Sequence, residues 1–416
     1  MKIADGVYVH FIPTQKYKTN RIVFRMTGSL NKQTIAKRAL VSQMLATANQ
    51  TYPTVQSFKE RLASLYGTQL STRVLTKGLT HSVDIELTYL KDAFIPKNNG
   101  LFWEVLGFLK ECLYKPLSRV AQYQNKVFDI EKQNLKTYLD VDTENNYYYS
   151  EVKGRELYFV NEGLKVPKYG QAELVEAETS FTAYQEFQSM LTRDRIDIFM
   201  VGEFDDYQVL QALHRFPLEG RQVDLQFSYS QPYVNVVKEK IEPRQSSQSI
   251  LQLGYQFSCQ YGDKDYFALI VFNAMFGEFA HSALFTTLRE KEGLAYSISS
   301  QFDVFTGLLE VYAGIEKSNR NQAMRGISRE LNYIKLGRFS SSLLNQTKKI
   351  IRMNALLSED HALTLVEQRF NKVIFGDKSL SLENWLDEIE KVTKKDVCRV
   401  ARQVKLQSLF FLEGVS

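Results

Sequence analysis

Apolar and polar positions follow two periods along the first half of the chain. Alternating or short apolar runs predict strands over 6–13, 21–26, 68–75, 81–89 and 196–201. A period near 3.6 residues predicts helices over 34–49, 54–66, 101–114, 119–140 and 205–214. Thr54 is the expected N-cap of the second helix, and Gly67 marks its end. Strands and helices are therefore mixed throughout this half.

The second half repeats this order of elements. We expect strands over 250–255, 295–302, 307–314 and 409–412. Helices are expected over 264–276, 281–291, 317–337, 340–358, 360–375 and 382–404. An offset of 226 residues places Gly67 on Gly293 and aligns the flanking elements. The order strand, helix, helix, glycine, strand, strand thus occurs twice and indicates a tandem domain duplication.

A polar stretch over 228–249 separates the two halves. It contains Pro232 and Pro243 and is expected to hold little regular structure. We place the domain boundary near residue 230, which gives domains 1–230 and 231–416.

Composition narrows the class of protein. The 416 residues include 44% hydrophobic and 24% charged side chains, which is ordinary globular composition, and a net charge of +5 is too mild to indicate nucleic acid. No apolar window reaches membrane-spanning length, so we expect no membrane segment. Three cysteines without a C-x-x-C pair fit a reducing compartment, and the expected location is the cytoplasm.

The histidines exclude one kind of site. The chain has five, and neighbouring histidines are more than 60 residues apart. No helix can then carry two histidine ligands, so H-E-x-x-H and its inverse are absent. G-x-S-x-G, G-x-G-x-x-G and the phosphate-binding loop are absent too. By motif, the chain has no catalytic centre of its own.

One region carries a more specific pattern. It reads N-A-M-F-G at 273–277, S-A-L-F at 282–285, L-R-E-K-E-G-L-A-Y-S at 288–297 and Y-A-G at 312–314. This pattern resembles the second domain of the insulinase/pitrilysin-like zinc metallopeptidases. The resemblance implies an α+β fold, a tandem duplication of a metallopeptidase-like domain in which each copy is a mostly antiparallel sheet packed against helices.

The same resemblance identifies where the family's zinc site has been lost. The family motif H-x-x-E-H aligns with residues 39–43, where Ala39 and Gln43 replace the two histidines and Ser42 replaces the glutamate base. The family's third ligand aligns with Tyr138. Alanine has no donor atom and an amide is a poor zinc ligand. The chain is expected to bind no metal and to match the family's non-catalytic bacterial members.

Arg289 and Tyr296 are the candidate substrate-binding residues. In the family, this arginine and tyrosine face a chamber opposite the zinc and bind substrate. A guanidinium and a phenol can both donate to a peptide carbonyl or to the oxyanion that forms on it. The structural alternative is a salt-bridged helix arginine and a half-buried strand tyrosine.

Our leading hypothesis is a non-catalytic, substrate-binding subunit of a heterodimeric zinc endopeptidase. The partner would be a catalytic subunit of the same family that carries the zinc, and the substrate a peptide bound partly as an added strand. The first alternative is a peptide-binding or scaffold protein without a role in hydrolysis, for example in bacteriocin maturation. The second is a self-sufficient enzyme with an unrelated site, which the scarce histidines disfavour.

Overall fold

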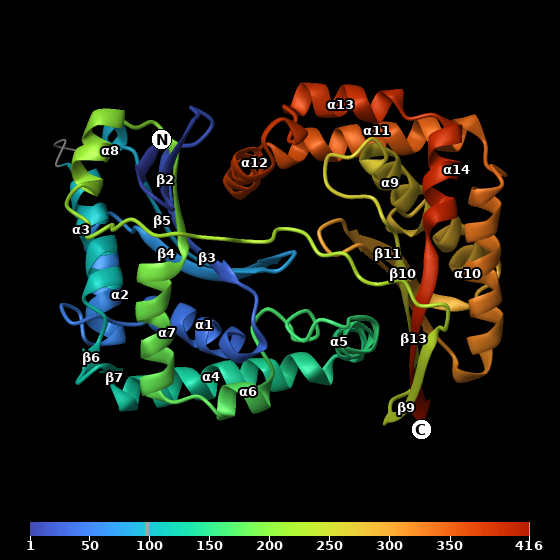
Figure 1. The fold of residues 1–416 in the computed structure, drawn as a ribbon, viewed down its shortest axis with the longest axis horizontal. Helices are drawn as coiled ribbons and strands as arrows, with labels where there is room; N and C mark the ends of the chain where they lie inside the picture. The colour runs from blue at the N-terminus through green and yellow to red at the C-terminus, as the bar shows by residue number, and fades with distance from the viewer. Residues whose placement is uncertain (96–99, 416) are drawn as a thin grey trace. The chain divides into compact units, whose positions relative to one another are not determined.

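The computed structural model describes residues 1–95 and 100–415, which form two compact units (Figure 1). The first unit comprises Met1–Val141, Val166–Phe227 and Ala362–Arg369, and the second comprises Asp142–Lys165, Ser228–His361 and Phe370–Ser416. Each unit thus includes a short segment from the other half of the sequence. The domains 1–230 and 231–416 remain a prediction from the sequence.

The first unit is built on a six-stranded sheet. Its order is β1-β2-β8-β3-β5-β4, and only the β2–β8 pair among these strands is parallel. The strands are β1 (Lys2–Ala4), β2 (Val7–Pro13), β3 (Thr19–Ser29), β4 (Gln69–Lys77), β5 (Thr80–Leu90) and β8 (Arg195–Gly202). Even-numbered residues of β3, such as Phe24, face the hydrophobic core, where helices cover the sheet.

Helices of this unit mostly follow the predicted periods. They are α1 (Lys32–Leu45), α2 (Val55–Ser64), α3 (Leu101–Tyr114), α4 (Asn125–Glu144), α6 (Ala172–Glu176), α7 (Ser180–Arg193) and α8 (Asp206–Leu213). Thr54 caps α2 as expected, since its side chain accepts a hydrogen bond from the Ser57 amide. The expected start of a helix at 119 is wrong, because β6 (Ser118–Arg119) and β7 (Gln122–Tyr123) form a hairpin there.

The second unit repeats the sheet of the first. Its five strands have the order β11-β12-β10-β13-β9, and β13 and β9 are parallel. They are β9 (Lys238–Gln245), β10 (Ser249–Gln256), β11 (Ala295–Asp303), β12 (Leu308–Ile315) and β13 (Lys405–Val415). This order matches the order β4-β5-β3-β8-β2 in the sheet of the first unit. Adding the offset of 226 to the first and last residues of β4 gives the first and last residues of β11. The predicted duplication and the α+β class are confirmed.

Helices of the second unit depart more from the sequence pattern. They are α5 (Asn146–Tyr158), α9 (Tyr266–Asn273), α10 (Arg320–Lys335), α11 (Ser341–Ser358), α12 (Ala362–Phe375, shared with the first unit), α13 (Leu382–Lys391) and α14 (Lys394–Gln403). The predicted helix over 382–404 is two helices, because Thr393 and Asp396 form a capping box that starts α14. Two π-helices, η2 (Ala274–Glu278) and η3 (Phe285–Lys291), occupy parts of the predicted helices 264–276 and 281–291.

Residues 228–249 also differ from the expectation of irregular structure. Strand β9 lies within them and pairs with β13 from Lys238 to Gln245. Its sequence, K-E-K-I-E-P-R-Q, lacks the alternating apolar pattern of the other strands, and most of its residues are exposed. The strand therefore depends on backbone pairing with β13 and not on burial of its own side chains.

Outside the hydrophobic core, the other face of the first sheet carries an ion network. Both Asp84 carboxylate oxygens accept from Arg25 at 2.8 Å, and Glu367 on α12 binds Arg25 and Lys77. Although burial opposes it, the charges of Arg25 and Lys77 lower the pKa of Glu367 to about 2. In the second unit, α5 covers the corresponding face, and Arg155 donates to both oxygens of the buried Glu310 at 3.0 and 2.7 Å.

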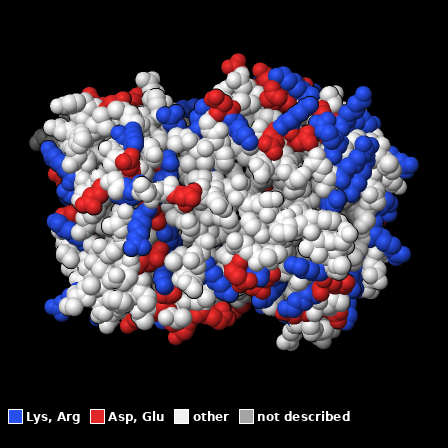
Figure 2. All heavy atoms as spheres, in the orientation of Figure 1, with Lys and Arg blue, Asp and Glu red and all other residues white. Residues whose placement is uncertain are grey.

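Surface cations gather over the second unit where α10 and α14 lie (Figure 2). Several are bound by carboxylates of the same chain: Arg399 pairs with Asp265 and Asp396, and Arg329 pairs with Glu292. The positive charge of these helices is thus partly neutralised within the protein. Among the described residues, no helix combines the length and the apolar character needed to cross a membrane.

Arg38 is the one charged residue of α1 that lies in the protein interior. It is 5% exposed, and its guanidinium donates to both Asp194 oxygens at 2.8 Å and to Glu186 at 2.8 Å. The ion pair between Arg38 and Asp194 holds α1 to the end of α7, where Asp194 is the C-cap residue.

We expect Arg38→Ala to lower the free energy of unfolding by about 3–5 kcal/mol, since it leaves the Asp194 carboxylate buried without its cation. Urea unfolding followed by circular dichroism measures this change. Lys37→Ala, one position earlier on the same helix, is the matched control and should change stability by less than about 0.5 kcal/mol. Equal stability of the Arg38 variant and the wild type would contradict this account of α1.

Candidate functional site

The positions aligned with the family's zinc ligands lie in two helices of the first unit. Ala39, 0% exposed, belongs to the hydrophobic core, and Ser42 is buried beside it. The carbonyl of Ser42 accepts from the Thr72 hydroxyl at 2.9 Å, which ties α1 to β4. Gln43 is half-buried, and its carbonyl accepts from the Thr47 hydroxyl at 2.9 Å. These residues support packing of the helix.

Tyr138, aligned with the third ligand, lies on α4 and is 50% exposed. Its ring meets the ring of Tyr169 edge-on, with centroids 6.0 Å apart. A phenol, an amide, a hydroxyl and a methyl group do not fit zinc, which prefers imidazole, thiolate and carboxylate ligands. Within residues 1–95 and 100–415, no cluster of three or more His, Cys, Asp or Glu side chains is placed to hold a metal ion.

Arg289 lies on the π-helix η3 of the second unit. The wide turn of this helix is seen in the amide of Glu292, which donates to the carbonyl of Thr287 at 2.9 Å. The Arg289 side chain is exposed, and its guanidinium carbon lies 4.6 Å from the centroid of the Phe285 ring. The described part of the chain offers this guanidinium no hydrogen bond or ion pair. The salt-bridged alternative for Arg289 is therefore not what the structure shows.

Tyr296 lies at the start of β11, the edge strand of the second sheet. The pairing with β12 slips between Ala295 and Ser297, so Tyr296 is the extra residue of a bulge. Its side chain is 60% exposed, more than the half-buried alternative expected. The hydroxyl donates to Glu316 Oε1 at 3.0 Å, and this hydrogen bond, together with the carboxylate charge, raises the pKa of Tyr296.

Sequence reasoning missed two residues in this region, Glu316 and Tyr147. Glu316 directly follows β12, and the pairing of Ile315 with Ala295 brings it close to Tyr296. Tyr147, on α5, meets Ser297 Oγ with its hydroxyl at 2.6 Å and stacks edge-on against Tyr312. The register of the predicted strands 295–302 and 307–314 could have indicated Glu316. Nothing in the sequence around Tyr147 signals its contact with β11.

Comparison with known proteins identifies the family. Residues 184–351 match the peptidase M16 inactive domain. The chain is 30% identical over 410 residues to the "Probable inactive metalloprotease YmfF" of Bacillus subtilis strain 168, covering 98% of this chain and 96% of that protein. The chain belongs to the M16 peptidase family. The resemblance to insulinase-like metallopeptidases is thereby confirmed, and the chain is a non-catalytic M16 member.

Solved structures share the fold of this chain. A conserved protein from Enterococcus faecalis V583 is 36% identical, with a TM-score of 0.97 over 100% of this chain and 98% of that chain. The peptidase M16 inactive domain from Pseudomonas fluorescens is only 16% identical but shares the fold, with a TM-score of 0.79 over 99% of this chain and 97% of that one.

We expect the purified chain to contain no stoichiometric zinc, and we expect that restoring the M16 motif by substitution fails. In an Ala39→His, Ser42→Glu, Gln43→His variant, two large side chains would enter a packed interior, at a cost of about 1–3 kcal/mol for overpacking alone. Elemental analysis after dialysis, with thermal unfolding alongside, tests both points. A variant that holds one zinc per chain and unfolds at the wild-type temperature would contradict the burial argument.

Proposed function

We propose that this M16 protein is the non-catalytic, substrate-binding subunit of a heterodimeric zinc endopeptidase. The partner is a catalytic M16 subunit that supplies the zinc and the general base. The present chain supplies Arg289 and Tyr296, in its C-terminal domain 231–416, to a chamber shared with that partner. Its N-terminal domain 1–230 keeps the degenerate zinc site. The three cysteines are unpaired and buried, which suits a reducing compartment, and we place the pair in the cytoplasm.

The observation that carries this proposal is the edge of the second sheet. Among the described residues β11 pairs only with β12, so its other side has backbone groups open to an added strand. A peptide bound there would run past Tyr296, whose side chain is exposed, and Arg289 is exposed on the element just before it. This combination supports strand addition with two side-chain donors near one end of the bound peptide.

One contact favours the scaffold alternative. The Tyr296 hydroxyl has a single proton, and Glu316 accepts it. A phenol that donates to a carboxylate cannot donate to a peptide carbonyl with the same proton. In the peptidase reading, Tyr296 must therefore leave Glu316 when substrate binds. In the scaffold reading, the two residues form a fixed surface pair and take no part in hydrolysis.

Reconstitution with the partner tests the proposed role. The partner is sought as a neighbouring open reading frame of similar size that carries H-x-x-E-H. The isolated chain should not cleave unfolded peptides, and the mixture should. Arg289→Ala or Tyr296→Phe should lower kcat/KM of the mixture about 100-fold if the donor acts on the developing oxyanion. A contact made only in the bound substrate should cost roughly 10-fold, mainly in KM.

Gel filtration shows whether each variant still forms the heterodimer. Lys317→Ala, just after β12, is the control for a lost surface cation, since Lys317 pairs with Glu413 and has no assigned role in substrate binding. If both site variants match the wild type while the heterodimer forms, Arg289 and Tyr296 are structural, and the scaffold alternative is supported.

Glu316→Ala gives a sharper test of Tyr296. Removing the carboxylate frees the phenol proton and removes a negative charge near the proposed oxyanion, so kcat/KM of the mixture should rise, by roughly 2- to 10-fold. The gain should disappear in the Tyr296→Phe, Glu316→Ala double variant, because it depends on the hydroxyl. A fall in kcat/KM on Glu316→Ala would show instead that the tyrosine and glutamate act as a unit.

A further inference from the structure

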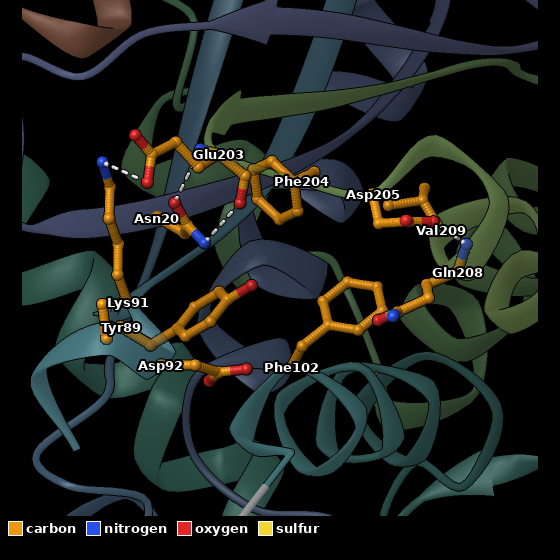
Figure 3. Close-up of a pocket in the computed structure, with 11 residues that line it drawn as sticks. Asn20, Tyr89, Lys91, Asp92, Phe102, Glu203, Phe204, Asp205, Gln208 and Val209 are labelled. Carbon is orange, nitrogen blue, oxygen red and sulfur yellow. Dashed lines mark hydrogen bonds and ion pairs between the residues drawn. The ribbon is translucent and has the colours of Figure 1, made fainter. Parts of the chain in front are cut away.

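A cavity of about 200 Å³ lies in the first unit, at the end of the sheet where β5 and β8 finish. A single water needs only about 10–15 Å³ of such space, so the cavity admits a larger group. Its walls come from the first residues of β3, the end of β5, helix α3 and the loop into α8 (Figure 3). None of these residues belongs to the positions discussed above.

Hydrogen bonds within the chain hold the wall of this cavity in place. The Asn20 side chain donates to the carbonyl of Glu203 at 3.0 Å and accepts from its amide at 3.0 Å. Gly202 adopts φ +129°, and a Cβ there would lie 2.2 Å from Asn20 Oδ1, so only glycine fits. The loop after β8 is thereby fixed beside the cavity.

Two buried polar groups in the cavity lack a partner. Tyr89 is 2% exposed, and its hydroxyl makes no hydrogen bond within the described residues, although Asn20 lies near it. The buried Asp92 Oδ1 has no partner among these residues either, and burial raises the pKa of Asp92. In Figure 3 the Tyr89 hydroxyl and the Asp92 carboxylate point toward the same space, with the Phe102 ring across from them. Buried polar groups are nearly always paired, so these two atoms are candidate contacts for a ligand.

The chemistry of the walls indicates the sign of that ligand. Three carboxylates line the cavity, on Asp92, Glu203 and Asp205, against one cation, Lys91. Lys91 and Glu203 balance each other, since Lys91 Nζ lies 3.3 Å from Glu203 Oε2, and Asp205 caps α8 by accepting from the Gln208 amide at 2.8 Å. Asp92, whose Oδ1 has no partner among the described residues, carries the negative charge that is left. The rings of Phe102 and Phe204, with centroids 6.1 Å apart, add aromatic surface of the kind that attracts cations.

We propose that this cavity binds the guanidinium or ammonium group of an arginine- or lysine-like ligand. Asp92 accepts hydrogen bonds from the cation and balances its charge. The unpaired Tyr89 oxygen accepts a further N–H, and the alkyl arm packs on Phe102 and Phe204. Such a group occurs both in free amino-acid derivatives and in the basic side chains of a peptide, and the chemistry is the same for both.

Isothermal titration calorimetry on the full chain tests the site with matched pairs of probes. N-acetylarginine amide is compared with its neutral isostere, N-acetylcitrulline amide, and an unstructured peptide with one arginine is compared with the same peptide carrying citrulline. The arginine form of at least one pair should bind, and its citrulline form should bind at least about tenfold more weakly, because a hydrogen bond to a charged group is lost. Binding of the free derivative identifies a small-molecule site, and binding of the peptide alone identifies a peptide side chain as the source.

Variants assign the binding to the cavity. Asp92→Asn should weaken binding of the arginine probe by at least about tenfold, and Tyr89→Phe should weaken it by a few-fold. Tyr89→Phe should fold at least as well as the wild type, since the lost hydroxyl makes no hydrogen bond, and thermal unfolding checks this. Asp129→Asn, an exposed position on α4, is the control for the charge change and should bind like the wild type. The proposal is overturned if neither arginine probe binds, if arginine and citrulline bind alike, or if Asp92→Asn binds like the wild type.

Discussion

The burial of helix α1 on nearly all of its sides limits which residues the first unit can carry there. Nine residues of this 14-residue helix are buried: Ile35, Ala36, Arg38, Ala39, Leu40, Val41, Ser42, Met44 and Leu45. Gly170 approaches so closely that a Cβ there would meet Ala36 at 3.3 Å. The one buried charge, Arg38, requires two carboxylates around it. New charges or large side chains on this helix would lack both space and partners.

This constraint agrees with the prediction that α1 no longer carries metal ligands. A zinc-binding helix must keep two imidazoles and a carboxylate facing an open, polar site. With Ala39 and Ser42 in their places, the same face becomes ordinary interior and contributes hydrophobic contacts. The second unit is not subject to this change, because the residues proposed to contact substrate lie on a separate sheet edge. Under the proposed function, hydrolysis is lost from this chain while the β11 edge keeps a role in peptide binding.

Sequence periodicity was sufficient to predict the helices and strands whose own side chains pack against the core. Helix α3 shows its period clearly, because its buried residues recur at every third to fourth position. Strand β3 reads as a short apolar run, because residues 22–28 are all buried. Strand β9 was missed for the opposite reason: its residues are mostly exposed, and its conformation comes from pairing with β13. Helix α5 was missed as well, because its sequence is only weakly amphipathic. It contacts the second sheet through the polar groups of Arg155, Tyr147 and Tyr158. The duplication contained a usable signal, because β9 is the counterpart of β2.

The same distinction applies to the candidate site. The positions of Arg289 and Tyr296 on a helix and the following strand were predictable from local pattern, whereas the bulge and the Glu316 contact depend on strand register. The duplication adds an argument about these two residues. At the offset of 226, the counterparts of Arg289 and Tyr296 in the first unit are Ala63 and Leu70. Ala63 lies near the end of α2 and Leu70 near the start of β4, on either side of the corresponding helix-to-strand turn. That turn folds in the first unit with neither a guanidinium nor a phenol at these two positions. Arg289 and Tyr296 are thus not required by this turn. The exposed Arg289 guanidinium is available for binding, whereas the Tyr296 hydroxyl must first leave Glu316.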